Sequence, residues 1–224
     1  MRVLRGARCG NFARRDLRGG TGQPVSLPQA LRIKMKIIPL LIATVVSLSS
    51  CQSFYRVDPE GTAVLSTNQF KLPRQIDGFR REYVRAFDGS GYDVGAGYNY
   101  YSTTNQAALT VYVMSVRAGN APTRQEADSH FRAASTEIKN AHPGATVVST
   151  STINGHGGTG MLVEYRYDEV FAGSKQPVCS LLAVFGDRSR LLKYRLTGLK
   201  SQAPELKSAL IQIVKAMSMK NGEH

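Results

Sequence analysis

Apolar and polar residues alternate with a period of two through the middle of the chain, which is typical of strands with one buried face. The clearest run covers residues 92–101, where Val94, Ala96 and Tyr98 fall on the same side of the alternation. β-forming residues also fill residues 79–87 and 108–116 on either side of this run. Short turns separate the three runs, so the pattern predicts an antiparallel meander of three strands.

The segment that follows changes to the spacing of a helix. Thr123 and Glu126 form a capping-box pattern, in which the threonine oxygen accepts from the Glu126 amide and the carboxylate reaches back to the Thr123 amide. The apolar residues after it recur every three or four positions: Ala127, Phe131, Ala134, Ile138 and Ala141. We therefore predict a helix that stops at residues 142–144 (His-Pro-Gly) and lays its apolar stripe on the sheet.

Four further strands and a second helix are predicted in the last third of the chain. The strands cover residues 146–153, 161–167, 178–185 and 190–196, with glycine-containing turns after the first and the third. The helix runs from about residue 203 to residue 219, and its apolar stripe consists of Leu206, Leu210, Ile213 and Met217. The order βββ-α-ββββ-α predicts an α+β fold, in which two helices pack on a single antiparallel sheet of about seven strands.

A different apolar segment near the N-terminus predicts export. Met35 and Lys36 precede an apolar run at residues 37–48, which is shorter than the roughly 20 residues that span a bilayer and suits a secretory signal. The sequence Leu-Ser-Ser-Cys at 48–51 follows, and it resembles the lipobox of bacterial lipoproteins. The resemblance implies cleavage between Ser50 and Cys51 and attachment of acyl chains, such as palmitate, to Cys51. An ordinary signal peptide with a chance cysteine and a buried apolar helix are the alternatives.

These features divide the chain into four parts. Residues 1–34 are rich in arginine and lack apolar periodicity, and we expect them to be an upstream extension outside the native protein; a flexible basic tail is the alternative. Residues 35–50 are the expected signal peptide, residues 51–70 a lipid-anchored tether and residues 71–220 a single α+β domain. By resemblance to lipoprotein sorting signals, Gln52 after the cysteine favours the outer membrane, with the domain facing the periplasm.

Setting aside the residues before Cys51 changes both the charge and the cysteine count. The net charge is +13 for the whole chain and +5 from Cys51 onward, and so mild an excess does not indicate nucleic acid as a partner. Cys9 lies in the expected extension, which leaves Cys179 as the one cysteine that is not lipidated. Cys179 lies in an apolar strand and is expected to be a small buried hydrophobe; a reactive or intermolecular thiol is the alternative.

The sequence contains no recognisable catalytic or cofactor-binding motif. Histidines, cysteines and acids show no metal-ligand spacing, and no nucleophile motif stands in a suitable context. Gly95 and Gly97 lie inside a strand with no helix after it, so they indicate a bulge or a closely packed helix and not a phosphate loop. We therefore expect no catalytic residue, no metal, no cofactor and no enzymatic activity.

Two features are candidates for ligand binding. The first is a glycine-rich loop that contains Asn154, Gly155, His156, Gly157 and Gly158. Its backbone amides are of the kind that bind anions, and a plain flexible hairpin loop is the alternative. The second is the distribution of tyrosines over both faces of the strands, because some of them must then face solvent or a partner. Strand propensity explains these tyrosines equally well.

Several segments resemble a family of uncharacterised proteobacterial envelope lipoproteins. They are LPRQIDGFRR at 72–81, VGAGYNY at 94–100, LTVYV at 109–113 and LKYRLTG at 192–198. The order of strands and helices is also similar to PsbP-like α+β domains. Neither resemblance implies an active site. The sequence thus predicts a lipid-anchored, non-enzymatic envelope protein that binds a protein or another envelope component. The alternative is a domain that binds a small anion or lipid in a pocket between sheet and helices.

Overall fold

The computed structural model describes residues 54–87, 93–101, 106–115, 122–171, 173–187 and 190–222. The predicted signal peptide, its cleavage site at Ser50 and the lipidation site at Cys51 lie outside the described residues. Lipidation therefore stays a prediction from the sequence.

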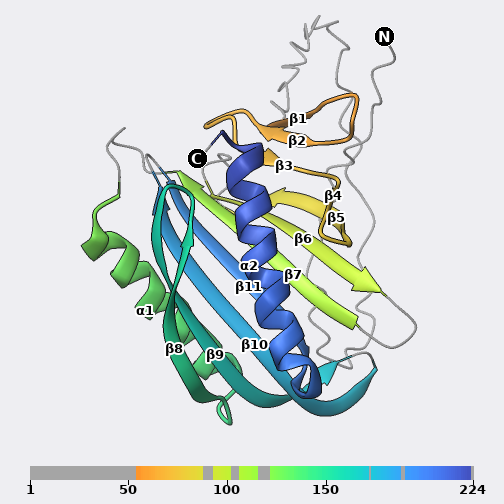
Figure 1. Cartoon of the computed structure of the whole chain (residues 1–224), viewed down its shortest axis with the longest axis vertical. Coiled ribbons are helices and arrows are strands. Elements are labelled where there is room, and N and C mark those ends of the chain that lie inside the picture. Colours follow the sequence, from red (N-terminus) through yellow and green to blue (C-terminus); the bar gives the residue numbers. More distant parts are fainter. Residues whose placement is uncertain are drawn as a thin grey trace, which may run out of the picture. The chain divides into compact units, whose positions relative to one another are not determined.

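Two antiparallel sheets and two long helices make up the described part of the chain (Figure 1). The large sheet has eight strands in the order β4-β5-β6-β7-β11-β10-β9-β8. Their bounds are β4 Gln75–Ile76, β5 Phe79–Ala86, β6 Asp93–Tyr101, β7 Gln106–Ser115, β8 Thr146–Gly155, β9 Gly158–Phe171, β10 Ser174–Asp187 and β11 Arg190–Leu199. The small sheet pairs β1 Tyr55–Val57, β2 Ala63–Leu65 and β3 Lys71–Leu72.

The α+β class and the order of the long elements agree with the prediction, but the prediction of one sheet of about seven strands is wrong. The main sheet gains β4, a two-residue strand that pairs with the start of β5 through a tight turn at Asp77 and Gly78, both at positive φ. The three strands of the small sheet are two or three residues long. Strands this short show no periodicity, so a pattern search does not detect them.

The segment expected to be a tether, residues 51–70, differs most from its prediction. From Phe54 onward it is part of the folded domain, because it carries β1 and β2. Ala63, Leu65 and Phe70 are at most 1% exposed and belong to the main core. The domain therefore begins well before residue 71.

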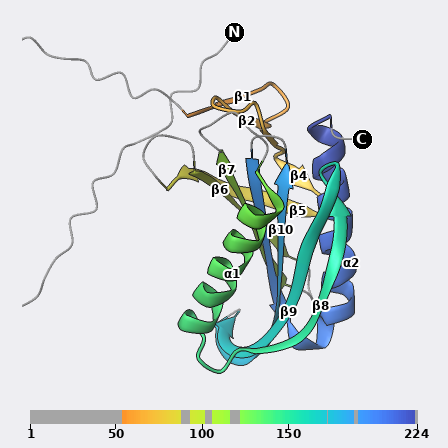
Figure 2. The ribbon, with the colours of Figure 1, turned by 90° about the vertical axis from the view of Figure 1, so that its left-hand side faces the viewer.

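The helices lie on opposite faces of the large sheet, as Figure 2 shows. The first helix, α1 (Arg124–Ala141), begins with the predicted capping box: the Glu126 amide donates to Thr123 Oγ1 at 3.2 Å, and the Thr123 amide donates to Glu126 Oε2 at 2.7 Å. Ala134 and Ile138 pack on β9 and β10. The second helix, α2 (Ala203–Lys220), follows a short 3₁₀ turn, η1 (Lys200–Gln202), and its predicted apolar stripe is buried.

The sheet face under α2 forms the larger of two cores, and we call it the closed face. Its buried side chains on the central strands are Val94, Ala96, Tyr98, Leu109, Val111, Leu181, Ala183, Leu192, Tyr194 and Leu196. On the other face, α1 covers β9 and β10. In the described part of the chain no helix packs on that second face over β5, β6 and β7, and this uncovered area defines the site described below.

Candidate functional site

Four neighbouring strands present polar and aromatic side chains on the face that carries α1, beside the helix. The register places Arg85, Gly95, Tyr112 and Lys193 in one row across β5, β6, β7 and β11. A second row consists of Tyr83, Gly97, Thr110 and Arg195. Directly opposed residues of antiparallel strands project to the same side of the sheet, so both rows share one surface. We call this surface the open face; it consists of Tyr83, Arg85, Phe87, Thr110, Tyr112, Lys193 and Arg195.

The two glycines of β6 let aromatic rings lie directly on the strand. A Cβ atom at Gly97 would lie 2.2 Å from Tyr83 Cε1, and one at Gly95 would lie 2.3 Å from Phe87 Cε2. The sequence predicted a bulge or a helix packed on these glycines. The register of β5 does shift between Arg81 and Tyr83, opposite Gly97, and the two rings lie where a packed helix was the other prediction. Tyr83 and Phe87 remain 46% and 45% exposed.

Aromatic rings also hold two of the cations on the open face. The Arg85 guanidinium carbon lies 4.5 Å from the centre of the Phe87 ring, and Lys193 Nζ lies 4.2 Å from the centre of the Tyr112 ring. The two rings are themselves 5.5 Å apart. Each cation–π contact contributes about 0.5–1 kcal/mol at an exposed site and leaves the charge of the cation uncompensated.

Arg195 makes the most hydrogen bonds of the described cations on the open face. Its Nε donates to Ser180 Oγ at 3.4 Å, and its Nη2 donates to Tyr167 Oη at 2.9 Å and to His142 Nε2 at 3.3 Å. The His142 and Tyr167 rings stack with their centres 4.0 Å apart, which fixes both acceptors. All three acceptors are uncharged groups when His142 is neutral, and His142 must be neutral at Nε2 to accept.

Two carboxylates lie on or beside this surface. By the register of β6, Asp93 belongs to the same face as Gly95 and Gly97. Among the described residues, Lys193 pairs with Glu137 of α1 at 3.5 Å, and the Glu137 side chain is 71% exposed, so solvent screens the pair. Burial raises the pKa of Tyr112, and the neighbouring Tyr83 raises it further, while the charges of Arg195 and Arg85 lower it. The rings and the cations of the two rows are therefore within electrostatic reach of one another.

The glycine-rich loop predicted to bind an anion is a two-residue turn in the structure. Asn154, Gly155 and Gly158 belong to β8 and β9, and the turn itself is His156-Gly157, with φ of 53° and 71°. Two central residues at positive φ are the signature of a tight β-hairpin turn.

The histidine of this turn is enclosed by the closed face. His156 is 3% exposed, its Nε2 lies 2.6 Å from Tyr194 Oη, and its amide donates to Ser218 Oγ of α2 at 2.7 Å. A Cβ at Gly155 would lie 2.3 Å from Val214 Cγ1, so α2 packs directly on the hairpin end. Through these contacts of His156 and Gly155, the turn links α2 to the sheet.

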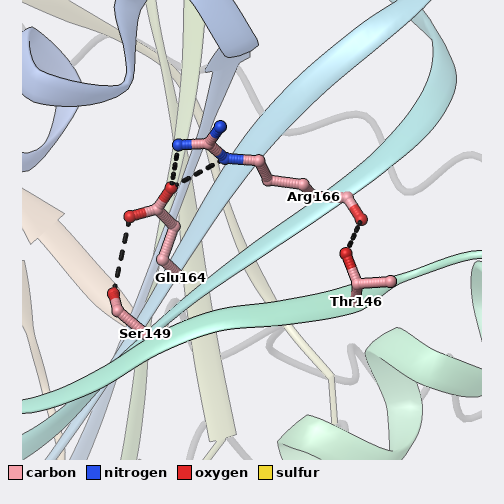
Figure 3. Close-up of polar contacts among 4 residues, drawn as sticks. All are labelled: Thr146, Ser149, Glu164 and Arg166. Carbon is pink, nitrogen blue, oxygen red and sulfur yellow. Dashed lines mark hydrogen bonds and ion pairs between the residues drawn. The ribbon is translucent and has the colours of Figure 1, made fainter.

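A second polar cluster joins the edge strand β8 to β9 (Figure 3). Glu164 Oε1 accepts from Arg166 Nε at 2.9 Å and from Nη2 at 2.8 Å, and Glu164 Oε2 accepts from Ser149 Oγ at 3.5 Å. Thr146 Oγ1 donates to the Arg166 carbonyl at 3.3 Å. The groups satisfy one another within the sheet, so the cluster is best explained as structural.

Cys179 lies beside this cluster and is fully buried, as the sequence predicted. Burial raises the pKa of the Cys179 thiol to about 12, and the negative charge of Glu164 adds to the effect. The thiolate is the reactive form of cysteine, so the native thiol is inert near neutral pH.

A cavity of about 270 Å³ lies between α2 and the strands β5 to β7. Phe79, Tyr100 and Leu206 form apolar walls, and Asp77 and Glu205 supply two carboxylates.

Over the described residues, no three histidine, cysteine or acidic side chains group in a way that could hold a metal ion. None of the helices described is both long and apolar enough to cross a membrane.

Comparisons with known proteins give a fold-level likeness only. No known protein family and no curated protein matches the chain. The solution structure of the cyanobacterial PsbP protein CyanoP from Synechocystis matches with 18% identity and a TM-score of 0.41, over 73% of this chain and 89% of that one. LpqN, involved in cell envelope biogenesis of Mycobacterium tuberculosis, matches with 16% identity and a TM-score of 0.38, over 62% and 78%.

A protein of unknown function from Pseudomonas aeruginosa, PA94, matches with 15% identity and a TM-score of 0.38, over 72% of this chain and 97% of that one. The neighbours thus include a PsbP protein and an envelope biogenesis protein, both at low identity. Likeness at this level identifies neither a ligand nor a binding surface.

Proposed function

We propose that the protein is a non-enzymatic, lipid-anchored envelope protein that binds a protein partner with an acidic surface through the open face. The observation that carries the proposal is the arrangement of Arg85, Lys193 and Arg195 beside aromatic rings. Uncharged groups hold Arg85 and Arg195, and the one ion pair, between Lys193 and Glu137 among the described residues, is screened by solvent. The anchor rests on the lipobox-like sequence that ends at Cys51.

The composition of the open face fits a protein interface. Tyrosine, phenylalanine and arginine are enriched at interfaces, and tyrosine and arginine are frequent among the residues whose truncation costs the most affinity. An excess of positive charge favours an acidic partner, because complementary charge speeds association and disfavours other partners.

The open face is also organised before any partner arrives. Tyr83 and Phe87 rest on the glycines of β6, and the rings of Phe87 and Tyr112 orient their cations. Side chains that are already ordered lose less conformational entropy on binding, so more of the contact free energy appears as affinity.

Site-specific photo-crosslinking tests the proposal. A photoreactive phenylalanine replaces Tyr83 or Phe87 in the Cys51→Ala full-length chain, and the matched control carries it at Ile211, which is 42% exposed on α2. In envelope extracts we expect one acidic protein to crosslink from the open-face positions, and we expect high salt to abolish it. Equal crosslinking from Ile211, or none from Tyr83 and Phe87, would count against the proposal.

The cavity under α2 supports a second candidate function, the binding of a small ligand. The two carboxylates of Asp77 and Glu205 favour a cationic or hydroxyl-rich ligand over the anion that the sequence hypothesis named. A ligand that binds the native state raises the melting temperature. A thermal-shift screen with amines, sugars and anions separates these classes, and Glu205→Gln should remove any shift that an amine produces.

A further inference from the structure

We infer that Arg195 is the anion-binding centre of the open face and that it receives a carboxylate group of the partner. The inference rests on the proposed function only for the source of that carboxylate. The site itself follows from the surroundings of the guanidinium group.

The first argument is the unused hydrogen-bonding capacity of Arg195. A guanidinium group carries five N–H donors. The described contacts use Nε and Nη2, which bind the hydroxyls of Ser180 and Tyr167 and the ring nitrogen of His142. Nη1 makes no hydrogen bond to any described residue. Both hydrogens of Nη2 are used, so a carboxylate would bind at Nη1, where a charge-assisted hydrogen bond is stronger than one to an uncharged acceptor.

The second argument is electrostatic. Arg195 is half-buried, and it forms no ion pair with a described carboxylate. His142 caps the C-terminal end of α1, so the partial negative charge of the helix end lies close to the guanidinium group. That partial charge corresponds to roughly half an elementary charge and leaves part of the positive charge uncompensated. A half-buried cation attracts an anion more strongly than an exposed one, because water screens it less.

The third argument is the position of further donors. Thr110 stands directly opposite Arg195, and Tyr112 and Lys193 occupy the next row of the same surface. Opposed Cβ atoms lie about 5 Å apart, so the Thr110 hydroxyl is within reach of an anion bound at Arg195. The Tyr112 hydroxyl is protonated near neutral pH and can donate. Lys193 adds a second positive charge.

Tyr167 and His142 act as positioning residues. They are held by their mutual stacking, and both accept from the same Nη2 atom. These two hydrogen bonds fix the plane of the guanidinium group and leave Nη1 available to a ligand. Because the two residues touch Arg195 and not the ligand, their loss should weaken anion binding without abolishing it.

Nuclear magnetic resonance of the arginine Nε–Hε groups tests the site without a partner. The Cys51→Ala full-length chain is titrated with sodium acetate, against sodium chloride at equal ionic strength. We expect the Arg195 signal, assigned with Arg195→Lys, to shift and saturate with acetate, while the signals of Arg80 and Arg85 change little. Tyr167→Phe should raise the acetate concentration at half-saturation. Proportional shifts of all arginine signals, or no shift at Arg195, would overturn the inference.

The second part of the test measures how Arg195 variants change the crosslinking yield of the partner. We expect Arg195→Gln and Arg195→Lys each to lower the crosslinking yield about tenfold or more, because each removes the planar donor group. Arg56→Gln, an exposed arginine on β1 of the small sheet, is the matched control and should change the yield less than threefold. A melting temperature close to that of the parent chain shows that the variants are folded, and Tyr167→Phe replaces Arg195→Gln if the latter unfolds.

The acetate titration tests the anion site, and the crosslinking experiment tests the proposed function, so one can fail without the other. Saturable acetate binding at Arg195 without any crosslinked partner would overturn the proposed function and keep the anion site. A partner that crosslinks from Tyr83 and is indifferent to Arg195→Lys, together with no response to acetate, would keep the proposed function and overturn the role of Arg195.

Discussion

The closed and open faces are built from the same strands, and they differ in almost every other respect. On β11, Leu192, Tyr194 and Leu196 are fully buried, while the residues between them, Lys193 and Arg195, are only half-buried. On β6, Val94, Ala96 and Tyr98 face the closed side, and glycines occupy the alternate positions. Adjacent residues of one strand thus serve two different surfaces.

The comparison shows how stability and binding are separated in this fold. The closed face concentrates the apolar burial, and burial raises the pKa of Tyr98 well above its ordinary value while its hydroxyl donates to the Pro73 carbonyl at 3.1 Å. Because that face and the core under α1 supply the stability, the open face carries cations and exposed rings at little cost. Substitutions on the closed face should therefore lower the free energy of unfolding. Substitutions on the open face should instead weaken binding of the partner.

The largest expected effect is the loss of a core side chain on the closed face. Leu192→Ala should lower the free energy of unfolding by about 2–5 kcal/mol, because a buried leucine leaves a cavity. The neighbouring Lys193→Ala is the matched control and should cost less than about 1 kcal/mol. Urea unfolding measures both, and equal losses would show that the two faces do not differ in this way.

A smaller effect is expected from a single hydroxyl. Tyr194→Phe removes the contact between Tyr194 Oη and His156 Nε2 and should lower the free energy of unfolding by about 1–3 kcal/mol. Tyr112→Phe makes the same chemical change on the open face and should cost less than about 1 kcal/mol, since water can replace the lost partner. Thermal unfolding of the two variants shows whether burial of the hydroxyl determines how much free energy of unfolding is lost.

The buried thiol of Cys179 predicts a dependence of stability on pH. The unfolded thiol ionises near its ordinary pKa of 9.0 and the native thiol near 12, so the contribution is complete below pH 9 and is lost as the pH rises towards 12. The slope is at most about 1.4 kcal/mol per pH unit. In a chain with Cys9→Ala and Cys51→Ala, a thiol reagent at pH 8 should label Cys179 only after denaturation, and rapid native labelling would contradict the burial.

The smallest effect on stability should accompany a clear effect on binding. Lys193→Gln removes one cation–π contact and a screened ion pair, so it should change the free energy of unfolding by less than about 1 kcal/mol. It should lower crosslinking of the acidic partner and weaken its dependence on salt. Lys215→Gln makes the same change of charge at an exposed position of α2 and should leave crosslinking unchanged.

The long elements could be predicted because their patterns are local. Period-two alternation located β6, β-forming residues bounded by turns located the other long strands, and the capping box and apolar stripes located both helices. The small sheet could not be predicted, because strands of two or three residues carry no periodic signal. The burial of His156 could not be predicted, because it depends on α2, which lies about 60 residues further along the chain.

The sequence predicted some features of the open face and missed others. Tyrosines on both faces of the strands indicated that some rings face outward, and the paired glycines of β6 marked a close approach. The pairing of β7 with β11 is not local, so nothing in the pattern placed Lys193 and Arg195 opposite Tyr112 and Thr110. Phe87 was missed because its ring lies on Gly95 across a pair of strands.

The early start of the folded domain sets the reach of any lipid anchor. If Cys51 is acylated, only Gln52 and Ser53 separate it from Phe54, which packs against the main core. Three residue-to-residue steps span at most about 11 Å at full extension. The domain would then stay within a thin layer next to the bilayer surface. Under that constraint, a partner must come to the membrane surface, because this protein cannot extend outward to meet it.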